Sequence, residues 1–174
     1  MSANWRSSLL AKPAEEREAF VRGLTTHEAA RLLYDWPSWA RASQQPPPGD
    51  WDGWLILAGR GWGKTRVGME FVRAEVEAGR AERIALIAET AADGRDVLVE
   101  GPSGILALSP PWDMPVYEPS KRRVTWQNGA IATLYDAREP NQLRGPQHDL
   151  AVLDELAKYR YPQDVFDMLL FGLR

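Results

Sequence analysis

The 174-residue sequence contains no cysteine and only two histidines. The lack of thiols excludes disulfides and thiolate metal sites, which fits a reducing compartment. His27 and His148 cannot build a zinc site by themselves. No apolar run approaches the about 18 residues of a membrane span, and residues 1–16 lack the apolar core and cleavage pattern of a secretion signal. We therefore expect a cytoplasmic protein with no membrane partner.

Positive charge is not in excess, since 21 Lys and Arg stand against 24 Asp and Glu and the net charge is −3. A protein that holds nucleic acid tightly on its own is usually basic. The composition therefore does not favour a stand-alone DNA binder, although a local basic face or a ring of subunits stays open. The basic run 121–123 either touches a DNA backbone or is a solvated run of charge, which such runs more often are.

The first 45 residues predict a helical lead-in to the rest of the chain. Residues 13–22 open with a proline and acids, as the first turns of helices do. Thr25–Glu28 has the pattern of a capping box before a second helix, which Pro37 should end. This helical part is predicted as one domain, 1–45, and the rest of the chain as a core domain, 46–174.

Three apolar runs in the core, residues 54–58, 83–89 and 149–155, predict buried strands. Residues 64–80 between the first two read as a helix, with Gly79 placed as its C-terminal cap. Strand, helix and strand in this order are the βαβ pattern of a parallel sheet. The predicted fold class is therefore α/β.

Three further elements are expected in the second half of the chain. Residues 92–108 predict a helix followed by a turn at Gly101. Asn128-Gly129 lies between two β-rich runs and predicts a type I′ hairpin. Another helix should begin at Pro162.

A glycine-rich segment joins the first predicted strand to the following helix. It reads Ala58, Gly59, Arg60, Gly61, Trp62, Gly63, Lys64, Thr65. Glycines let successive backbone N–H groups point inward, and the helix N-terminus adds its positive end, so the segment predicts a phosphate cradle. Lys64 would reach the β- and γ-phosphates of ATP and the Thr65 hydroxyl would bind Mg²⁺. The alternative is a glycine-rich surface turn; the strand before the loop and the helix after it favour the nucleotide-binding loop.

Two acids end the third predicted strand, in the stretch LAVLDE. A P-loop ATPase needs an acid at a strand end to hold Mg²⁺, and a base to orient the attacking water. Asp154 suits the first role and Glu155 the second. Many strands end in acids, so this pattern gains weight from its place after the loop and at least one βα unit. The adjacent glutamate favours ATP hydrolysis over phosphoryl transfer to a small molecule.

With both motifs placed, the chain resembles the ATPase domain of the large terminase subunit of tailed phages and phage-derived gene-transfer particles. The resemblance covers residues 30–174 and rests on WARASQQPPPGDWDGWLILAGRGWGKTRVGMEFVR, EGPSGIL, QLRGPQHDLAVLDELAKY and MLLFGLR. It implies a P-loop NTPase fold of the additional-strand, catalytic-glutamate type, with a central, mainly parallel sheet flanked by helices. It also implies ATP-driven translocation of double-stranded DNA into an empty capsid, assembling in the cytoplasm of the host or producing cell.

The resemblance implies partners as well. The motor would be a homo-oligomeric ring, usually a pentamer, docked on the portal protein, with a small terminase subunit that recognises the DNA; a monomer in isolation is the alternative. A complete large subunit would continue into a coupling motif and a nuclease domain. We therefore expect this chain to be truncated before both and to have no nuclease activity.

The resemblance also suggests roles for Arg60, Arg144 and Gln44, and two readings are open for Trp62 in the loop. Arg60 matches a loop arginine that contacts the γ-phosphate, and its guanidinium could fork onto phosphate oxygens. Arg144 matches an arginine that enters the neighbouring subunit's site; the alternative is an arginine that ties its own loop down. Gln44 matches a glutamine that contacts adenine, with Gln45 as the alternative register. Trp62 would either wall the nucleotide or cover the loop.

Two other functions stay open at this point. One is a different P-loop DNA translocase or a helicase-like ATPase, although the chain shows no second recombination-like fold and no strand-contact motifs. The other is a truncated remnant that binds nucleotide, or only partner subunits, without motor activity. The presence of every expected site residue argues against decay by substitution.

Overall fold

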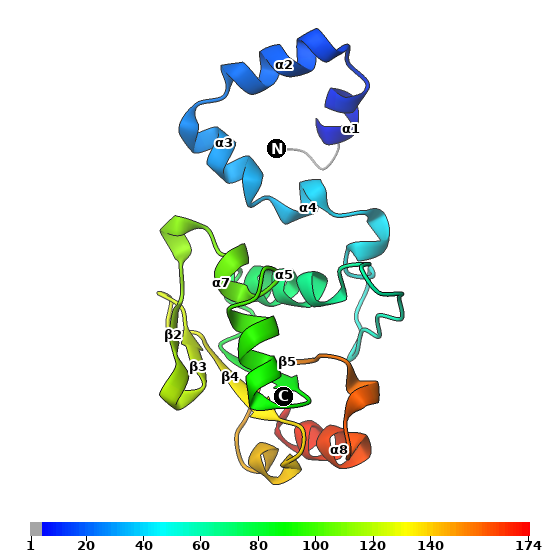
Figure 1. Cartoon of the computed structure of the whole chain (residues 1–174), viewed down its shortest axis with the longest axis vertical. Helices are drawn as coiled ribbons and strands as arrows, with labels where there is room; N and C mark the ends of the chain where they lie inside the picture. Colours follow the sequence, from blue (N-terminus) through cyan, green and yellow to red (C-terminus); the bar gives the residue numbers. More distant parts are fainter. Residues whose placement is uncertain (1–4) are drawn as a thin grey trace. The chain divides into compact units, whose positions relative to one another are not determined.

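The structure, a computed structural model, describes residues 5–174 and divides into two compact units (Figure 1). The first unit ends at Trp54 and the second runs from Leu55 to Arg174. The sequence placed the division between residues 45 and 46. No helix in the described part of the chain is long and apolar enough to cross a bilayer.

In the part of the N-terminal unit that the structure describes, the regular elements are all short helices. They are α1 (Trp5–Leu10), α2 (Ala14–Gly23), α3 (Thr26–Leu33), α4 (Trp36–Trp39) and the 3-10 turn η1 (Ala42–Gln44). The predicted capping box of α3 is confirmed: the Glu28 backbone N–H donates to Thr25 Oγ1 at 3.2 Å, and the Thr25 N–H donates to the Glu28 carboxylate at 2.9 Å. Helices α2 and α3 bury none of their described residues, so neither is held by a core; α3 has its capping box, whereas Pro13, the N-cap of α2, makes no side-chain hydrogen bond.

The C-terminal unit alternates helices and strands. Its helices and helical turns are α5 (Lys64–Glu77), α6 (Ala91–Asp93), the π-helical η2 (Gly94–Val99), α7 (Ile105–Leu108), η3 (Pro111–Asp113), η4 (Pro119–Lys121), η5 (Pro140–Leu143), η6 (Leu156–Lys158) and α8 (Pro162–Gly172). Its strands are β1 (Arg83–Ala88), β2 (Val116–Glu118), β3 (Arg123–Thr125), β4 (Ile131–Asp136) and β5 (Leu150–Leu153). The α/β class is confirmed.

The five strands form one mixed sheet in the order β2-β3-β4-β1-β5. Strand β1 pairs in parallel with β4 and with β5, whereas β2–β3 and β3–β4 are antiparallel. The expectation of a mainly parallel sheet was therefore wrong. The physical reason is the short connections between β2, β3 and β4, since a parallel pair needs a crossover of a dozen or more residues.

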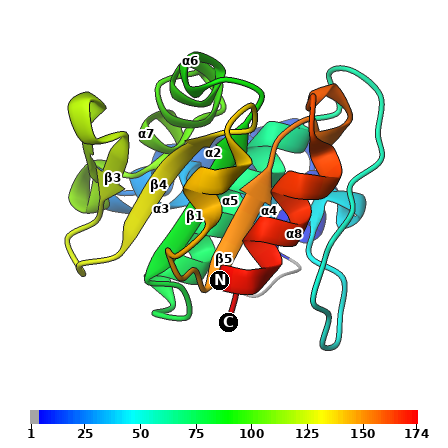
Figure 2. The same ribbon diagram turned by 90° about the horizontal axis from the view of Figure 1, so that it is seen from below.

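Helices cover both faces of this sheet (Figure 2). Side chains of α5, η2 and α7 pack on the face that carries Ile84 and Leu86 of β1. Side chains of α8 and η5 pack on the opposite face, around Ala85 and Ile87. This alternation follows from the period of two in a strand, and the five apolar residues from Ile84 to Ala88 are all buried, as a strand covered on both faces requires.

The segment predicted as the first strand, residues 54–58, does not join the sheet. It carries no strand assignment, and Leu55 and Leu57 are 74% and 85% exposed. Strand β5 lies at the edge of the sheet. Just before β5, His148 forms an isolated parallel bridge with Leu173 at the end of α8. A strand is a paired state, so an apolar run without a ladder partner stays extended and exposed. The predicted βαβ unit is thus present only as α5 followed by β1.

The predicted hairpin forms between β3 and β4, with Thr125 opposite Ile131. Its turn is not type I′, because only Gly129 has a positive φ, at 90°, and type I′ requires two such residues. The Asn128 side-chain amide donates to the Val76 carbonyl of α5 at 2.9 Å. Its side-chain oxygen accepts from the Ala130 N–H at 3.1 Å, so Asn128 is held both within the turn and by α5 outside the hairpin.

Candidate functional site

The loop before α5 turns at two glycines in the left-handed region. Gly61 has φ of 77° and Gly63 has φ of 97°. A side chain at either position would be strained, whereas glycine adopts these angles at no steric cost. Gly63 is also the N-cap of α5, and its carbonyl accepts the first helical hydrogen bond, from Val67 N at 2.9 Å. The loop therefore delivers the chain directly into the helix.

The N-terminus of α5 has no internal compensation for its positive end. The N-cap glycine offers no side-chain hydrogen bond, and the first turn contains no acid. The 14-residue helix begins instead with a cation, Lys64. Backbone N–H groups of a first helical turn, the helix dipole and an ammonium at the same point are together suited to an anion such as a phosphate group.

The Lys64 ammonium folds back over the loop. Its Nζ donates to the carbonyls of Ala58 at 2.9 Å and Gly59 at 3.1 Å. These bonds hold the ammonium over the loop that the sequence predicts to cradle phosphate. An incoming anion would compete for the same donors with charge-assisted hydrogen bonds, which are stronger than bonds to neutral carbonyls.

The helix start and the end of β5 meet in one hydrogen bond. Thr65 Oγ1 donates to Asp154 Oδ1 at 3.4 Å, although 89 residues separate the two in the chain. A hydroxyl and a carboxylate are oxygen ligands of the kind that Mg²⁺ prefers. The donor set therefore fits the predicted metal role of these two residues, and this is the contact that joins the two sequence motifs.

The Asp154 carboxyl is partly withdrawn from water. Burial raises its pKa, the neighbouring Glu155 carboxylate raises it further, and the Thr65 hydroxyl and nearby cations Lys158 and Lys64 act in the opposite direction. A divalent cation would reverse this balance by favouring the ionised carboxylate. A cation bound next to Asp154 would therefore offset the free-energy cost of burying its negative charge.

Glu155 turns the chain out of the strand. Its φ of 53° and ψ of 45° put it in the left-handed region, which is uncommon for a residue other than glycine. Its carboxylate forms an ion pair with Lys158, three residues later on η6. The side chain is about half exposed, at 47%, so water can reach the carboxylate that the sequence predicts as a general base.

One further acid, Asp136, lies at the same end of the sheet, and the sequence motifs did not single it out. Asp136 ends β4 opposite Ala88 of β1, and its buried carboxylate is held by two hydrogen bonds from the Arg138 guanidinium at 2.9 and 2.6 Å. The hydrogen bond from Arg138 lowers the pKa of Asp136, against the effect of burial. The signal that could have found it is the one used for Asp154, an acid directly after an apolar strand.

Three further predicted site residues are Arg60 and Trp62, on the same loop as Lys64, and Arg144. Arg60 is exposed on the loop, and Trp62 is half-buried there. Arg144 is exposed at the end of η5, where its N–H donates to Asn141 O at 3.1 Å. The loop after Arg144 leads to the amino end of β5, whereas Asp154 follows its carboxyl end. Among the described residues, Arg144 makes no hydrogen bond or ion pair with Thr65 or Asp154.

Gln44 lies in the N-terminal unit, and its predicted adenine contact stays a prediction. The residue is 7% exposed, and its side-chain oxygen accepts from the Arg41 backbone N–H at 3.0 Å. Gln45, the alternative in the sequence, donates from its side chain to Pro37 O at 3.2 Å. Burial and a backbone partner give Gln44 a structural role inside its own unit.

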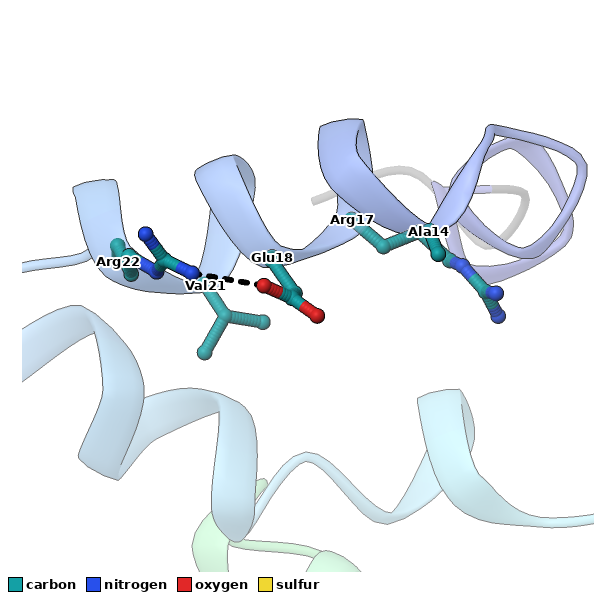
Figure 3. A pocket seen from close by; sticks show the side chains of 5 residues that line it. All are labelled: Ala14, Arg17, Glu18, Val21 and Arg22. Carbon is teal, nitrogen blue, oxygen red and sulfur yellow. Dashed lines mark hydrogen bonds and ion pairs between the residues drawn. The ribbon is translucent and has the colours of Figure 1, made fainter.

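A hollow in the surface lies on α2, and none of the predicted site residues lines it (Figure 3). It is lined by Ala14, Arg17, Glu18, Val21 and Arg22, all from one helix. Arg22 and Glu18 pair across one helical turn at 2.7 Å. A groove along a single exposed helix offers no converging groups for chemistry, so the candidate site stays at the start of α5.

One family of known proteins matches this sequence, described as the terminase large subunit, T4likevirus-type, N-terminal, and the match covers residues 55–172. Comparisons with curated proteins and with solved structures gave no significant match. The matched range begins with the C-terminal unit and contains the glycine loop, α5 and the acidic end of β5. The chain therefore belongs to the family of large terminase subunit N-terminal domains.

Proposed function

We propose that this chain is the Mg²⁺-dependent, ATP-hydrolysing motor domain of a large terminase subunit, which drives double-stranded DNA into a viral-type capsid. The observation that carries the proposal is the contact between Thr65 and Asp154 at 3.4 Å. It joins a glycine loop, and a helix start that has no acid in its own first turn, to an acidic strand end, in a chain of the terminase family.

In this proposal each residue of the cluster has one task. Lys64 and the N–H groups at the start of α5 bind the phosphates of ATP. Thr65 and Asp154 would hold Mg²⁺, which supplies neutralisation of the phosphate charge when it is bound. Glu155 orients the attacking water and accepts its proton, for which its partly exposed carboxylate is suited. Arg60 extends from the same loop toward the γ-phosphate.

The expected partners follow from the family rather than from this chain alone. They are double-stranded DNA, the portal protein and the small terminase subunit, with a ring of copies of the chain, five in the usual case. Arg144 would serve the active site of a neighbouring subunit in that ring. Its exposure at the end of η5 supports a contact between subunits.

The experiment is a comparison of ATP binding and phosphate release by the parent chain and Glu155→Gln. The substitution keeps the size and one acceptor oxygen of the side chain but removes the base. Binding should persist, with a Kd close to that of the parent, while Mg²⁺-dependent phosphate release should stop. A variant that releases phosphate at the parental rate would exclude Glu155 as the base, and a parent chain that binds no ATP would refute the proposal as a whole.

A second candidate function is nucleotide binding without turnover. Residues 55–58, which lead into the loop, form no strand, and Leu57 is 85% exposed. A loop held mainly by α5 can bind phosphate while its catalytic geometry stays loose. A parent chain that binds ATP but releases no phosphate at any concentration, with or without DNA, would favour this candidate.

A further inference from the structure

The turn that carries the two acids closes on a single carbonyl group of the neighbouring strand. Asp154 N donates to the Ile87 carbonyl of β1 at 3.0 Å, which continues the β1–β5 ladder by one bond. The Tyr159 hydroxyl donates to the same carbonyl at 2.7 Å. Both ends of the segment 154–159 are therefore attached to one acceptor, and Glu155 lies within the loop thus closed.

Tyr159 is built into the core at this point. It is 5% exposed and packs in the cluster that also contains Ile87, Val165 and Leu169, beneath α8. Its backbone N–H donates to Leu156 O at 3.1 Å, which ends the 3-10 turn η6. Burial, together with the nearby Asp154 carboxylate, raises the pKa of Tyr159, so the hydroxyl keeps its proton and remains a donor; a hydrogen bond with the Asp154 backbone acts in the other direction.

We propose that Tyr159 is a positioning residue for the acidic pair: its hydroxyl fixes the turn that places Asp154 toward Thr65 and holds Glu155 in its left-handed conformation. The inference rests on the proposed function, because it concerns the same site. Tyr159 does not touch nucleotide in this account. It acts through the backbone, as groups that support metal ligands and bases do in other sites.

A left-handed residue other than glycine needs such support. The conformation of Glu155 costs on the order of 1 kcal/mol and persists only where its surroundings hold it. Within the turn, Lys158 N donates to Glu155 O at 2.8 Å and the side chains of the same two residues form an ion pair. These contacts are local and partly exposed, whereas the Tyr159–Ile87 bond is buried and anchors the turn to the sheet.

The test compares Tyr159→Phe with a matched control, Tyr135→Phe. Tyr135 is buried in the same cluster, and its ring lies 5.4 Å from the His148 ring, centre to centre, near the amino end of β5, whereas the acidic turn follows the carboxyl end of β5. Both variants lose one buried hydroxyl and keep the ring. Urea unfolding of each gives its loss of stability, so that effects on the turn can be compared at a known cost to the fold.

The first readout is amide hydrogen exchange, measured residue by residue by NMR on the full 174-residue chain. In Tyr159→Phe the amides of Asp154 and Lys158 should exchange about fivefold faster, the factor expected for the loss of one average hydrogen bond. In Tyr135→Phe they should exchange at the parental rate. Equal rates at these amides in the two variants would overturn the inference, and this outcome does not depend on whether the chain hydrolyses ATP.

The second readout separates positioning from binding. In Tyr159→Phe the kcat for ATP hydrolysis should fall about tenfold relative to Tyr135→Phe, while the Kd for ATP without Mg²⁺ stays unchanged, because Lys64 and its loop are untouched. Faster exchange with an unchanged kcat would also overturn the inference. Failure of the proposed function is recognised separately, by a parent chain without phosphate release, and the exchange data then still decide whether Tyr159 holds the turn.

Discussion

The substitution Lys64→Ala should abolish tight ATP binding while leaving the fold intact. In the structure the Lys64 ammonium donates hydrogen bonds to the carbonyls of Ala58 and Gly59. Binding exchanges these neutral acceptors for phosphate oxygens, and a hydrogen bond to a charged group contributes about 1.5–3 kcal/mol. A net loss of about 2–3 kcal/mol corresponds to a Kd weakened roughly 30- to 150-fold.

Isothermal titration calorimetry with ATP and Mg²⁺ measures this Kd directly. The control is Lys121→Ala, which removes an exposed lysine paired with Glu118 on the β2–β3 turn and should leave the Kd unchanged. Circular dichroism and urea unfolding establish that both variants are folded, which is expected because alanine is a strong helix former at the first position of α5. An unchanged Kd in folded Lys64→Ala would refute the assignment of the loop as a phosphate site.

Three further predictions concern stability and assembly. Burial lowers the pKa of His148 from 6.5, so the unfolded chain binds a proton more readily than the folded chain, and the free energy of unfolding should fall as the pH drops below about 6.5. His148→Gln should flatten this part of the pH profile of stability measured by urea unfolding, and an unaltered profile would argue against this role of His148. Asp149→Ala should lower the free energy of unfolding in urea by about 1–2 kcal/mol, because the Asp149 carboxylate accepts hydrogen bonds from Glu82 N, Arg83 N and the Arg83 guanidinium at 3.0, 2.9 and 2.7 Å. Asp149→Asn should lose less, and equal stability of Asp149→Ala and the parent would show that these bonds contribute nothing. Arg144→Ala should reduce phosphate release only at concentrations where the chain assembles, and an equal loss in dilute monomer would exclude a role between subunits.

Sequence patterns correctly predicted the helices that are defined by interactions within their own turns, and the strand that is buried on both faces of the sheet. Helix α5 begins at Lys64 after the glycine loop and is followed by Gly79 with φ of 69°, as its sequence indicated. Strand β1 has the continuous apolar run of a strand covered on both faces, and α8 begins at Pro162. The capping box at Thr25 needs only residues of its own turn. In each case the deciding interactions lie within the quoted stretch or follow directly from its period.

The failures share the opposite property, because the deciding interaction lies elsewhere in the chain. Residues 54–58 have the composition of a buried strand, yet composition does not supply a partner, and Leu55 is left 74% exposed. The turn at Asn128 follows a contact to α5 that no hairpin rule contains. The antiparallel arrangement of β2, β3 and β4 depends on connection lengths that were visible in the sequence, but β2 has only three residues and gave no strand signal of its own.

In the candidate site, too, some residues could be predicted from local sequence and one depends on a distant contact. Lys64, Thr65, Asp154 and Glu155 could be named from motifs, because phosphate and metal chemistry restricts the residue types at each position. Tyr159 could not, since its role depends on Ile87, 72 residues earlier, and on a carbonyl group that every residue possesses. Motifs therefore locate the residues proposed to contact the ligand. The residues that position them are fixed by hydrogen bonds at the end of the β1–β5 ladder, which no motif contains. For this chain, that makes the end of the ladder at Ile87 the point where stability and the proposed chemistry depend on the same hydrogen bonds.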